Sequence, residues 1–462
     1  MRRFYHKLLG LAVATTLGVN ASAFSLMGPF ASWQTAAIGY NLAGDLGGPM
    51  NFFEDYRITV PVLNYGFDGT FLAFFGSNGV AAVNAAMTIL NAVPAASAMS
   101  STLTEFPLQA IGPANATAAS LQIRDLKSAA MSTVLGQMGL ASPERWVYTL
   151  RDRTVILNTT NYTVVQRNFD PVRLVPTNVV NGVLYTYTVA EPILPGNYAD
   201  AVESRVSGNI NNISVASVDD GGGLFAGQFF TSLTRDDYGA LRYLLRFNNV
   251  NVESLDATIT LADTTSPYAP FQGTNAQTNI PVAIARRPGI DRVSFSPIAL
   301  DSLLGIVVQA VTNRYVDQYF NPTNNVLTNQ TVQRAINLPD ILFTAGDIPF
   351  TGLPTGDTLL RPTTSRWVNN SALPGNTVGG GGALLSGPGV IPAALSNATA
   401  IVITFNTLGP SRLNFSTAGA RFLDERNASV NGVWGFYDAT TIYSVFPDGA
   451  TLQDLERQLY GR

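Results

Sequence analysis

ITVPVLNY, residues 58–65, decides the fold class of this 462-residue chain together with the alanine-rich stretch that follows it and ends before Pro94. The first segment is extended and apolar, as expected for a strand. In the second segment, apolar side chains recur at helical spacing from residues 77–78 onward, on the face that includes Val80 and Leu90. A strand followed by a helix indicates a chain that mixes the two kinds of element.

Three further stretches predict helices. One is expected over residues 118–138, where apolar positions again follow a helical period. Another begins at Thr234, whose hydroxyl can cap the amide of Asp237 while the Asp237 carboxylate returns the bond. The same pattern recurs at Thr451 with Asp454 and predicts a helix at the C-terminus.

Strand patterns dominate the rest of the chain. Apolar residues alternate with Thr, Ser or Asn over residues 146–156, 162–165, 182–189 and 400–405. The predicted fold class is therefore α+β. We expect a helix-containing α+β domain over residues 24–255, followed by a strand-rich, sandwich-like domain over residues 256–462 that ends in a helix.

The N-terminus has the three parts of a secretory signal peptide. Arg2, Arg3 and Lys7 form a basic head, residues 8–19 are apolar, and Ala21-Ser22-Ala23 supplies the small-residue cleavage site. We predict that residues 1–23 are removed and that the mature chain begins at Phe24. The protein is therefore expected to be secreted, to the extracellular space or the cell surface.

Removal of residues 1–23 leaves a chain with no histidine, no cysteine and a single lysine, Lys127. Thiolate and imidazole are the usual ligands of zinc and the usual nucleophile or base in acyl transfer, so these chemistries are excluded. Calcium needs only oxygen ligands, and Asp219-Asp220 before three glycines is the one candidate site for it. A solvated turn explains the same residues, and no other cofactor is expected.

Charge is sparse along the whole chain. Only 13% of the residues are charged, against roughly 25% in ordinary soluble proteins, and acids outnumber bases. A nucleic-acid surface needs clustered Lys and Arg, so nucleic acid is not an expected partner. A weakly charged, polar surface suits packing against copies of itself, or residence among extracellular polysaccharides. After the signal peptide no apolar run is long enough to predict a transmembrane segment in the mature chain.

The predicted mature N-terminus is unusually apolar. Phe24, Leu26, Phe30 and Trp33 lie within ten residues, whereas chain termini are normally polar and mobile. One interpretation is that this segment docks into its own domain. The other is that it adds as a strand to a neighbouring copy and so joins monomers into a fibre or lattice.

Two segments resemble the matrixin-like zinc peptidases. Residues 57–91 give an extended piece and then a helix containing Ala81-Ala82-Val83, and LTRDDYGAL, residues 233–241, is similar to the start of the last helix of those enzymes. The helix with two histidines and a catalytic glutamate that defines the family is absent. The resemblance implies at most a metalloprotease-like scaffold without zinc and without peptidase activity. A capped amphipathic helix after a loop would produce the Thr234 pattern unaided.

A broader resemblance covers most of the mature chain. RPGIDR at 287–292, DSLLG at 301–305, TNRY at 312–315 and LPDILF at 338–343 together resemble a family of uncharacterised secreted proteins from Verrucomicrobia and Planctomycetes. That resemblance implies export from a bacterium and no established activity.

These observations favour a secreted bacterial structural or surface protein that assembles with itself and is not an enzyme. The alternative is a carboxylate-dependent glycan-active enzyme or a glycan-binding protein, because glycoside hydrolysis needs two acids and no histidine. Four tryptophans are available for stacking on sugars: Trp33, Trp146, Trp367 and Trp434. An acid pair in an open aromatic cleft would favour the alternative, and a flat, apolar, self-complementary surface would favour the first function.

Overall fold

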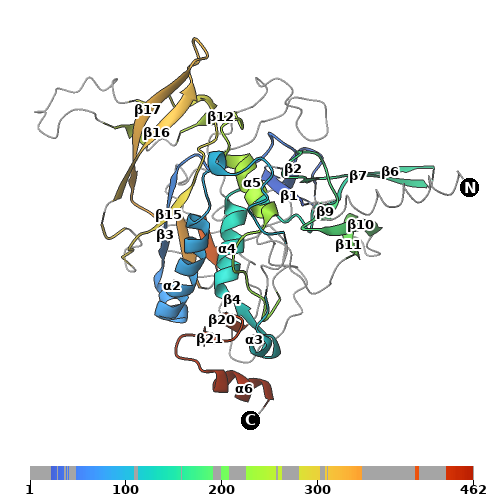
Figure 1. Cartoon of the computed structure of the whole chain (residues 1–462), viewed down its shortest axis with the longest axis vertical. Helices are drawn as coiled ribbons and strands as arrows, with labels where there is room; N and C mark the ends of the chain where they lie inside the picture. The colour runs from blue at the N-terminus through green and yellow to red at the C-terminus, as the bar shows by residue number, and fades with distance from the viewer. Residues whose placement is uncertain are drawn as a thin grey trace, which may run out of the picture.

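The structure is a computed structural model. It describes residues 22–28, 30–35, 38, 40, 48–108, 113–157, 159–190, 199–207, 225–255, 259–262, 280–301, 307–309, 311–345, 401–404 and 433–460. Strands in several small sheets are arranged around a few helices, so the predicted α+β, strand-rich class is confirmed (Figure 1).

Two helices occupy the middle of the molecule (Figure 1). α2, Gly69–Asn91, packs against α4, Leu126–Gln137. Asp68 caps α2 by accepting a hydrogen bond from the Phe71 amide at 2.8 Å, so the helix begins well before the predicted start at residues 77–78. The backbone leaves helical geometry at Gly76, and the predicted helix corresponds to the portion after this kink.

Among the described residues, α2 is the one helix that is long and apolar enough to cross a membrane by length and composition. Phe71, Phe75, Val83 and Leu90 on this helix are buried in the main hydrophobic core. A core helix of a folded domain has the same composition as a membrane span, so the absence of a transmembrane segment stays a prediction.

The helix predicted over residues 118–138 is interrupted, so that prediction is wrong. α3, Ala116–Ser120, is followed by Gln122 with a φ of 58°, in the left-handed region that a helix cannot continue through. A three-residue strand, β4 (Ile123–Asp125), then precedes α4. The apolar residues keep a helical spacing across the break, because Ile123 and Asp125 of the strand are buried as well.

Both predicted capping boxes are confirmed. α5, Arg235–Leu245, starts at Thr234, whose backbone N–H donates to Asp237 Oδ2 at 2.8 Å while the Asp237 amide donates to the threonine hydroxyl at 3.4 Å. α6, Leu452–Tyr460, starts at Thr451 with the same exchange.

A four-stranded parallel sheet draws on both halves of the chain. Its order is β15-β3-β18-β19, and all three pairings are parallel. The strands are β3 (Val62–Phe67), β15 (Ser294–Pro297), β18 (Ile341–Thr344) and β19 (Ile401–Thr404).

A smaller sheet also joins distant segments, because β4 pairs in parallel with β20, Val433–Tyr437, which pairs with β21, Ile442–Phe446. The main core accordingly includes residues from Ala23 to Phe446. The expected division near residue 255 is corrected: strands from both sides of it share sheets and a core, so it does not separate two domains.

The remaining described strands form ribbons and one larger antiparallel sheet. β6 (Thr149–Ile156) pairs only with β7 (Thr159–Val165) among the described strands. β10 (Val183–Ala190) lies between β11 (Asp200–Ser207) and the short β9 (Val179–Val180). These strands match the predicted stretches at 146–156, 162–165 and 182–189.

The larger sheet has the order β12-β14-β16-β17-β13 and is antiparallel throughout. Its strands are β12 (Asn251–Ser254), β13 (Ile259–Leu261), β14 (Ile284–Arg287), β16 (Val311–Phe320) and β17 (Leu327–Ile336). β16 and β17 extend far beyond their neighbours as a ribbon. This ribbon projects on one side of the molecule, and β6–β7 and β10–β11 project on another (Figure 1).

Candidate functional site

The four residues proposed for self-assembly lie at the protein's own core. Phe24 and Leu26 are fully buried in β1, Phe24–Gly28, and Phe30 and Trp33 are partly buried against the same core. β1 pairs with β5 (Leu140–Ala141) on one edge, and with β2 (Gly48–Met50) and β8 (Asn168–Phe169) on the other.

Both edges of β1 are therefore occupied within the chain. Leu26, for example, is in register with Met50 on one side and Leu140 on the other. The strand-addition interpretation of this segment is corrected accordingly, because a strand without a free edge cannot pair with a neighbouring copy. In this structure the segment docks into its own domain.

The candidate calcium residues, Asp219 and Asp220, lie outside the described residues. Within the part of the chain that the structure describes, no group of three or more acidic, histidine or cysteine side chains could hold a metal ion. α4, which lies in chain order between the two segments that resemble matrixin-like peptidases, contains no histidine and no acid.

The three tryptophans among the described residues do not form a sugar-stacking surface. Trp146 and Trp434 are fully buried, and Trp33 packs edge-on against Tyr40 at a centroid distance of 5.6 Å. Trp367 lies outside the described residues. Within the described residues, aromatic contacts to a ligand would therefore come from side chains other than tryptophan.

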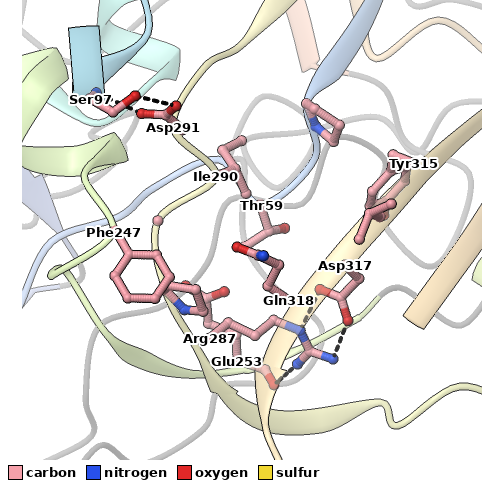
Figure 2. Close-up of a pocket in the computed structure, with 14 residues that line it drawn as sticks. Thr59, Ser97, Phe247, Glu253, Arg287, Ile290, Asp291, Tyr315, Asp317 and Gln318 are labelled. Atoms are coloured by element: carbon pink, nitrogen blue, oxygen red, sulfur yellow. Dashed lines mark hydrogen bonds and ion pairs between the residues drawn. The ribbon is translucent and has the colours of Figure 1, made fainter. Parts of the chain in front are cut away.

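A pocket of about 320 Å³ lies where the antiparallel sheet meets the segment before β3 (Figure 2). Strands β12, β14 and β16, the loop after β14, the loop after α5 and the short 3₁₀ helix η2, Ala96–Ala98, supply its walls. The lining residues are Thr59, Pro61, Ser97, Phe247, Glu253, Arg287, Pro288, Gly289, Ile290, Asp291, Tyr315, Val316, Asp317 and Gln318.

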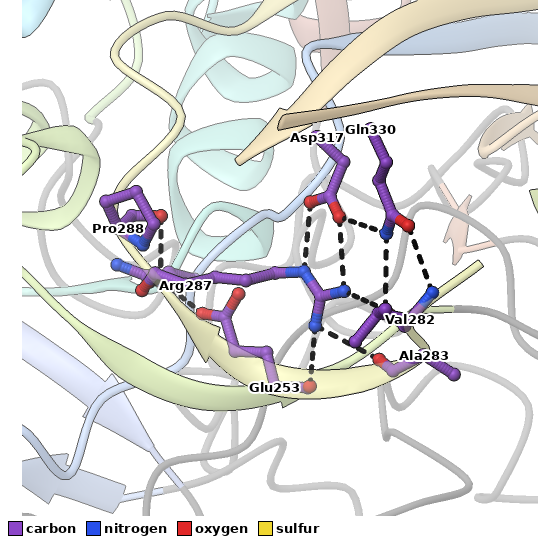
Figure 3. Close-up of polar contacts among 8 residues, drawn as sticks. Glu253, Val282, Ala283, Arg287, Pro288, Asp317 and Gln330 are labelled. Atoms are coloured by element: carbon purple, nitrogen blue, oxygen red, sulfur yellow. Dashed lines mark hydrogen bonds and ion pairs between the residues drawn. The ribbon is translucent and has the colours of Figure 1, made fainter. Parts of the chain in front are cut away.

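Arg287 and Asp317 form one ion pair in the pocket wall (Figure 3). Arg287 Nε and Nη2 donate to the two Asp317 carboxylate oxygens at 2.9 and 3.1 Å, and both side chains are buried. The Glu253 and Ala283 carbonyls accept from Nη1, and Gln330 Nε2 donates to Asp317 Oδ2 at 2.7 Å. Asp317 and Gln330 face each other across β16 and β17, so strand register positions this contact.

Arg57 and Glu253 form the second ion pair. Arg57 Nε contacts Glu253 Oε1, and Nη2 donates to the backbone carbonyls of Arg287 and Pro288 at 2.9 and 3.2 Å. Burial raises the pKa of the Glu253 carboxyl, and the positive charge of Arg57 opposes that rise. Two buried cations thus balance two buried anions, as buried charges generally require.

The rim of the pocket is aromatic and polar. Phe247 is 46% exposed, and it lies across the pocket from Tyr315 (Figure 2). Asp291 holds η2 against the rim, because Ser97 donates to its two carboxylate oxygens from the backbone N–H and the hydroxyl, each at 2.7 Å. Gln318 adds an amide that can both donate and accept.

This arrangement suits binding better than proton transfer. A glycosidase needs one carboxyl group that can give up a proton to the leaving group and a second that attacks or activates water. Here each carboxylate is held in place by an arginine, which restricts its movement. The pocket can offer hydrogen bonds and an aromatic surface to a neutral ligand.

The sequence did not predict this pocket. RPGIDR contributes Arg287 and the rim up to Asp291, but no spacing rule connects that segment with Glu253 or Asp317. The alternation of β16 was the only local signal, since it places Tyr315 and Asp317 on one face.

No known protein family, curated protein or solved structure matches this chain. The two resemblances noted in the sequence therefore stay predictions, and the function rests on the geometry of the described residues.

Proposed function

We propose that this chain is a secreted bacterial surface or matrix protein that assembles with copies of itself through its projecting β-ribbons. The observation that carries the proposal is the β6–β7 ribbon. Val155 and Ile156 near its tip are 56% and 57% exposed, and Leu157 in the turn is 95% exposed. From Asp152 to the tip, every residue of β6 is exposed.

A ribbon of this kind would be stabilised by contact with a binding partner. An isolated two-stranded hairpin is marginally stable in water, because it has no covered apolar face. Its outer edges also present backbone N–H and C=O groups to any other strand, a hazard that proteins usually block with lysine or proline. β6 and β7 contain neither residue. The charged residues of β6, Arg151 to Arg153, lie before its last three residues, which are Thr, Val and Ile.

Two other ribbons share this character. Val316, Val326 and Leu327 are exposed on or beside the β16–β17 ribbon, and Val202 and Val206 are exposed on β11. Because the ribbons leave the molecule on different sides, one copy has room to contact more than one neighbour (Figure 1). Repeated contacts of that kind would build a sheet or fibre rather than a closed dimer. The low charge of the chain would add little repulsion between copies.

The test is assembly of the exported protein, measured by size-exclusion light scattering and negative-stain electron microscopy. We expect the wild-type protein to form oligomers or sheets, and the double variant Ile156→Asp/Leu157→Asp to lose them without a change in melting temperature. Val172→Asp, which changes an exposed apolar residue outside the ribbons, is the matched control and should assemble normally. A monomeric wild-type protein, or assembly that survives in the double variant, would contradict the role of this ribbon.

A chain that starts after Trp33 is not a suitable test. Such a truncation removes β1, which pairs with three strands and carries the buried Phe24 and Leu26. Loss of assembly would then follow from unfolding.

Binding of an extracellular glycan is a second candidate function, and the pocket lined by Phe247, Tyr315 and Gln318 is the observation that favours it. Its two buried ion pairs are balanced and Asp291 adds one acid at the rim, so it does not favour an anionic ligand, whereas hydroxyl groups and the apolar face of a sugar ring match amide, carboxylate and aromatic side chains. Its volume of about 320 Å³ is at the lower end for small-ligand sites, which indicates one or two sugar units.

A panel of neutral oligosaccharides tests this second function. We expect binding of at least one of them by the wild-type protein, with loss in both Phe247→Ala and Gln318→Ala. Tyr443→Ala removes an exposed aromatic side chain far from the pocket in sequence and serves as the control. Absence of binding across the panel would leave the pocket without a glycan role.

A further inference from the structure

Asp236 is a buried acid in the first turn of α5. Its side chain is fully enclosed, and burial raises its pKa to about 8, with the neighbouring Asp237 adding to the rise. No arginine or lysine of the described residues lies within ion-pair distance of it. The two buried acids of the pocket, Glu253 and Asp317, are each paired with an arginine.

The hydrogen-bond donors to Asp236 come mainly from the end of the predicted signal peptide. Ser22 Oγ donates to Oδ1, and the Ala23 backbone N–H donates to the same carboxylate. The third donor is the Asn181 backbone N–H, at 2.8 Å from Oδ2. Ser22 and Ala23 are themselves buried.

Cleavage after Ala23 would remove two of these three donors. A buried carboxylate left with a single amide donor is unfavourable, because it has lost its hydration and has no opposite charge. The mature protein would therefore need a new partner for Asp236 at this position.

Cleavage also creates such a partner. The new α-amino group on Phe24 is a cation with three donors, and it is one residue from the Ala23 amide that contacts Asp236 in the uncleaved chain. Phe24 cannot drift away, because its ring packs against Phe169 and Tyr243 at centroid distances of 6.2 and 5.9 Å. Strand pairing of Phe24 with Phe169 fixes the start of β1 as well.

We propose that signal-peptide removal generates at Phe24 an ammonium group that binds Asp236 as a buried ion pair and so fastens β1 to α5. Peptide-bond hydrolysis between Ala23 and Phe24 consumes one water and leaves a carboxylate on the released peptide and the ammonium on the protein. This inference rests on the proposed export. Processing would then complete the fold as well as release the protein.

The mature chain is well suited to a direct test, because Phe24 and Lys127 carry its only amines. The full chain is expressed in a bacterium with secretory export, the exported protein is purified, and its first residue is read by mass spectrometry. An amine-acylating reagent is then applied under native conditions and again in urea, and labelling of the two amines is followed by peptide mass.

We expect the exported protein to begin at Phe24 and its α-amino group to react at least about tenfold more slowly when folded than in urea. In Asp236→Asn the α-amino group should become reactive in the folded protein, and the melting temperature should fall by about 5–10 °C. Asp237→Asn is the neighbouring control. It weakens the cap of α5 but should leave the Phe24 amine protected.

The outcomes separate the two parts of the inference. An exported protein that keeps Ser22 and Ala23 would overturn the cleavage position. A protein that begins at Phe24 but whose amine reacts equally fast when folded and in urea would overturn the ion pair alone. The wild-type comparison decides this even if Asp236→Asn does not fold.

Discussion

Arg57 is a residue at which distant parts of the chain meet. It lies just before β3, and its guanidinium contacts Glu253 on β12 and the backbone carbonyls of Asn249, Arg287 and Pro288. The side chain is almost completely buried, so each of these contacts is made out of reach of water. One side chain thus links the N-terminal segment to two strands of the antiparallel sheet.

Arg57→Ala should lower the free energy of unfolding by about 3–5 kcal/mol, because it leaves Glu253 as an unpaired buried charge. The double variant Arg57→Met/Glu253→Met removes both charges and should recover part of that loss, since only the carbonyl contacts remain unsatisfied. Urea unfolding measures both values. A double variant that is less stable than Arg57→Ala would show that the pair does not act as described.

Gly76 is a second residue whose identity is set by its surroundings. Its φ of 55° and ψ of −158° break α2 at the kink, and a Cβ built on it would collide with the Asp448 carboxylate. Gly76→Ala is therefore expected to cost about 2–3 kcal/mol of unfolding free energy. Gly136→Ala is the matched control inside α4, where an added Cβ meets no atom within 4 Å, and it should stabilise by about 0.5–1 kcal/mol. Thermal unfolding of the two variants should show shifts of opposite sign.

At the scale of single elements, the two capping boxes have the same sequence logic but different surroundings. Thr234 is buried and α5 packs against β1, whereas Thr451 is exposed at the start of α6. Thr234→Ala should therefore lower the free energy of unfolding by about 1–2 kcal/mol. Thr451→Ala should change it by less than about 0.5 kcal/mol, because fraying of α6 is a local event. Chemical denaturation compares the two, and equal losses would contradict this distinction.

The elements that could be predicted from sequence are those specified by neighbouring residues. A capping box needs only Thr234 and Asp237, and alternation within β6 or β10 needs only the strand itself. The break in the predicted helix at Gln122 could not be predicted, because no neighbouring residue indicates a positive φ at a glutamine.

Features that depend on distant pairing could not be derived from the sequence. The three-residue β4 exists because it pairs with β20, more than three hundred residues away in the chain. The pocket depends in the same way on register: Glu253, Arg287 and Asp317 lie on three strands of one sheet, and only the pairing of those strands brings the side chains together. The apolar segment at Phe24 was recognised correctly as needing cover, but its composition is the same whether its own chain or a second copy supplies that cover.

For the whole molecule, buried acids predict an unusual dependence of stability on pH. Burial raises the pKa of Asp55 to about 7, of Asp125 to about 6 and of Glu203 to about 8, in spite of nearby positive charges. Each group holds its proton to a higher pH in the folded state than in the unfolded chain, where carboxyl groups titrate near pH 4. Between about pH 4 and pH 8 the folded state therefore binds more protons, and stability falls as the pH rises.

We expect the melting temperature to be higher at pH 5 than at pH 8, when both are measured at the same ionic strength by circular dichroism. Asp125→Asn should flatten this dependence, because the amide keeps an oxygen for the Ser128 N–H but cannot ionise. A melting temperature that rises from pH 5 to pH 8 would mean that these carboxyls are ionised in the folded protein at little cost.

The parallel sheet also determines when the molecule can fold. Its strands are drawn from residues 62 to 404, so most of the polypeptide must be present before β3, β18 and β19 can pair. Folds dominated by such distant contacts form slowly. A chain that leaves the ribosome in this state remains unfolded for longer than one built from local contacts, and a secretory channel accepts only unfolded chains. For the export proposed above, this topology would give the transport machinery time to act, and the sheet would complete its assembly on the far side of the membrane.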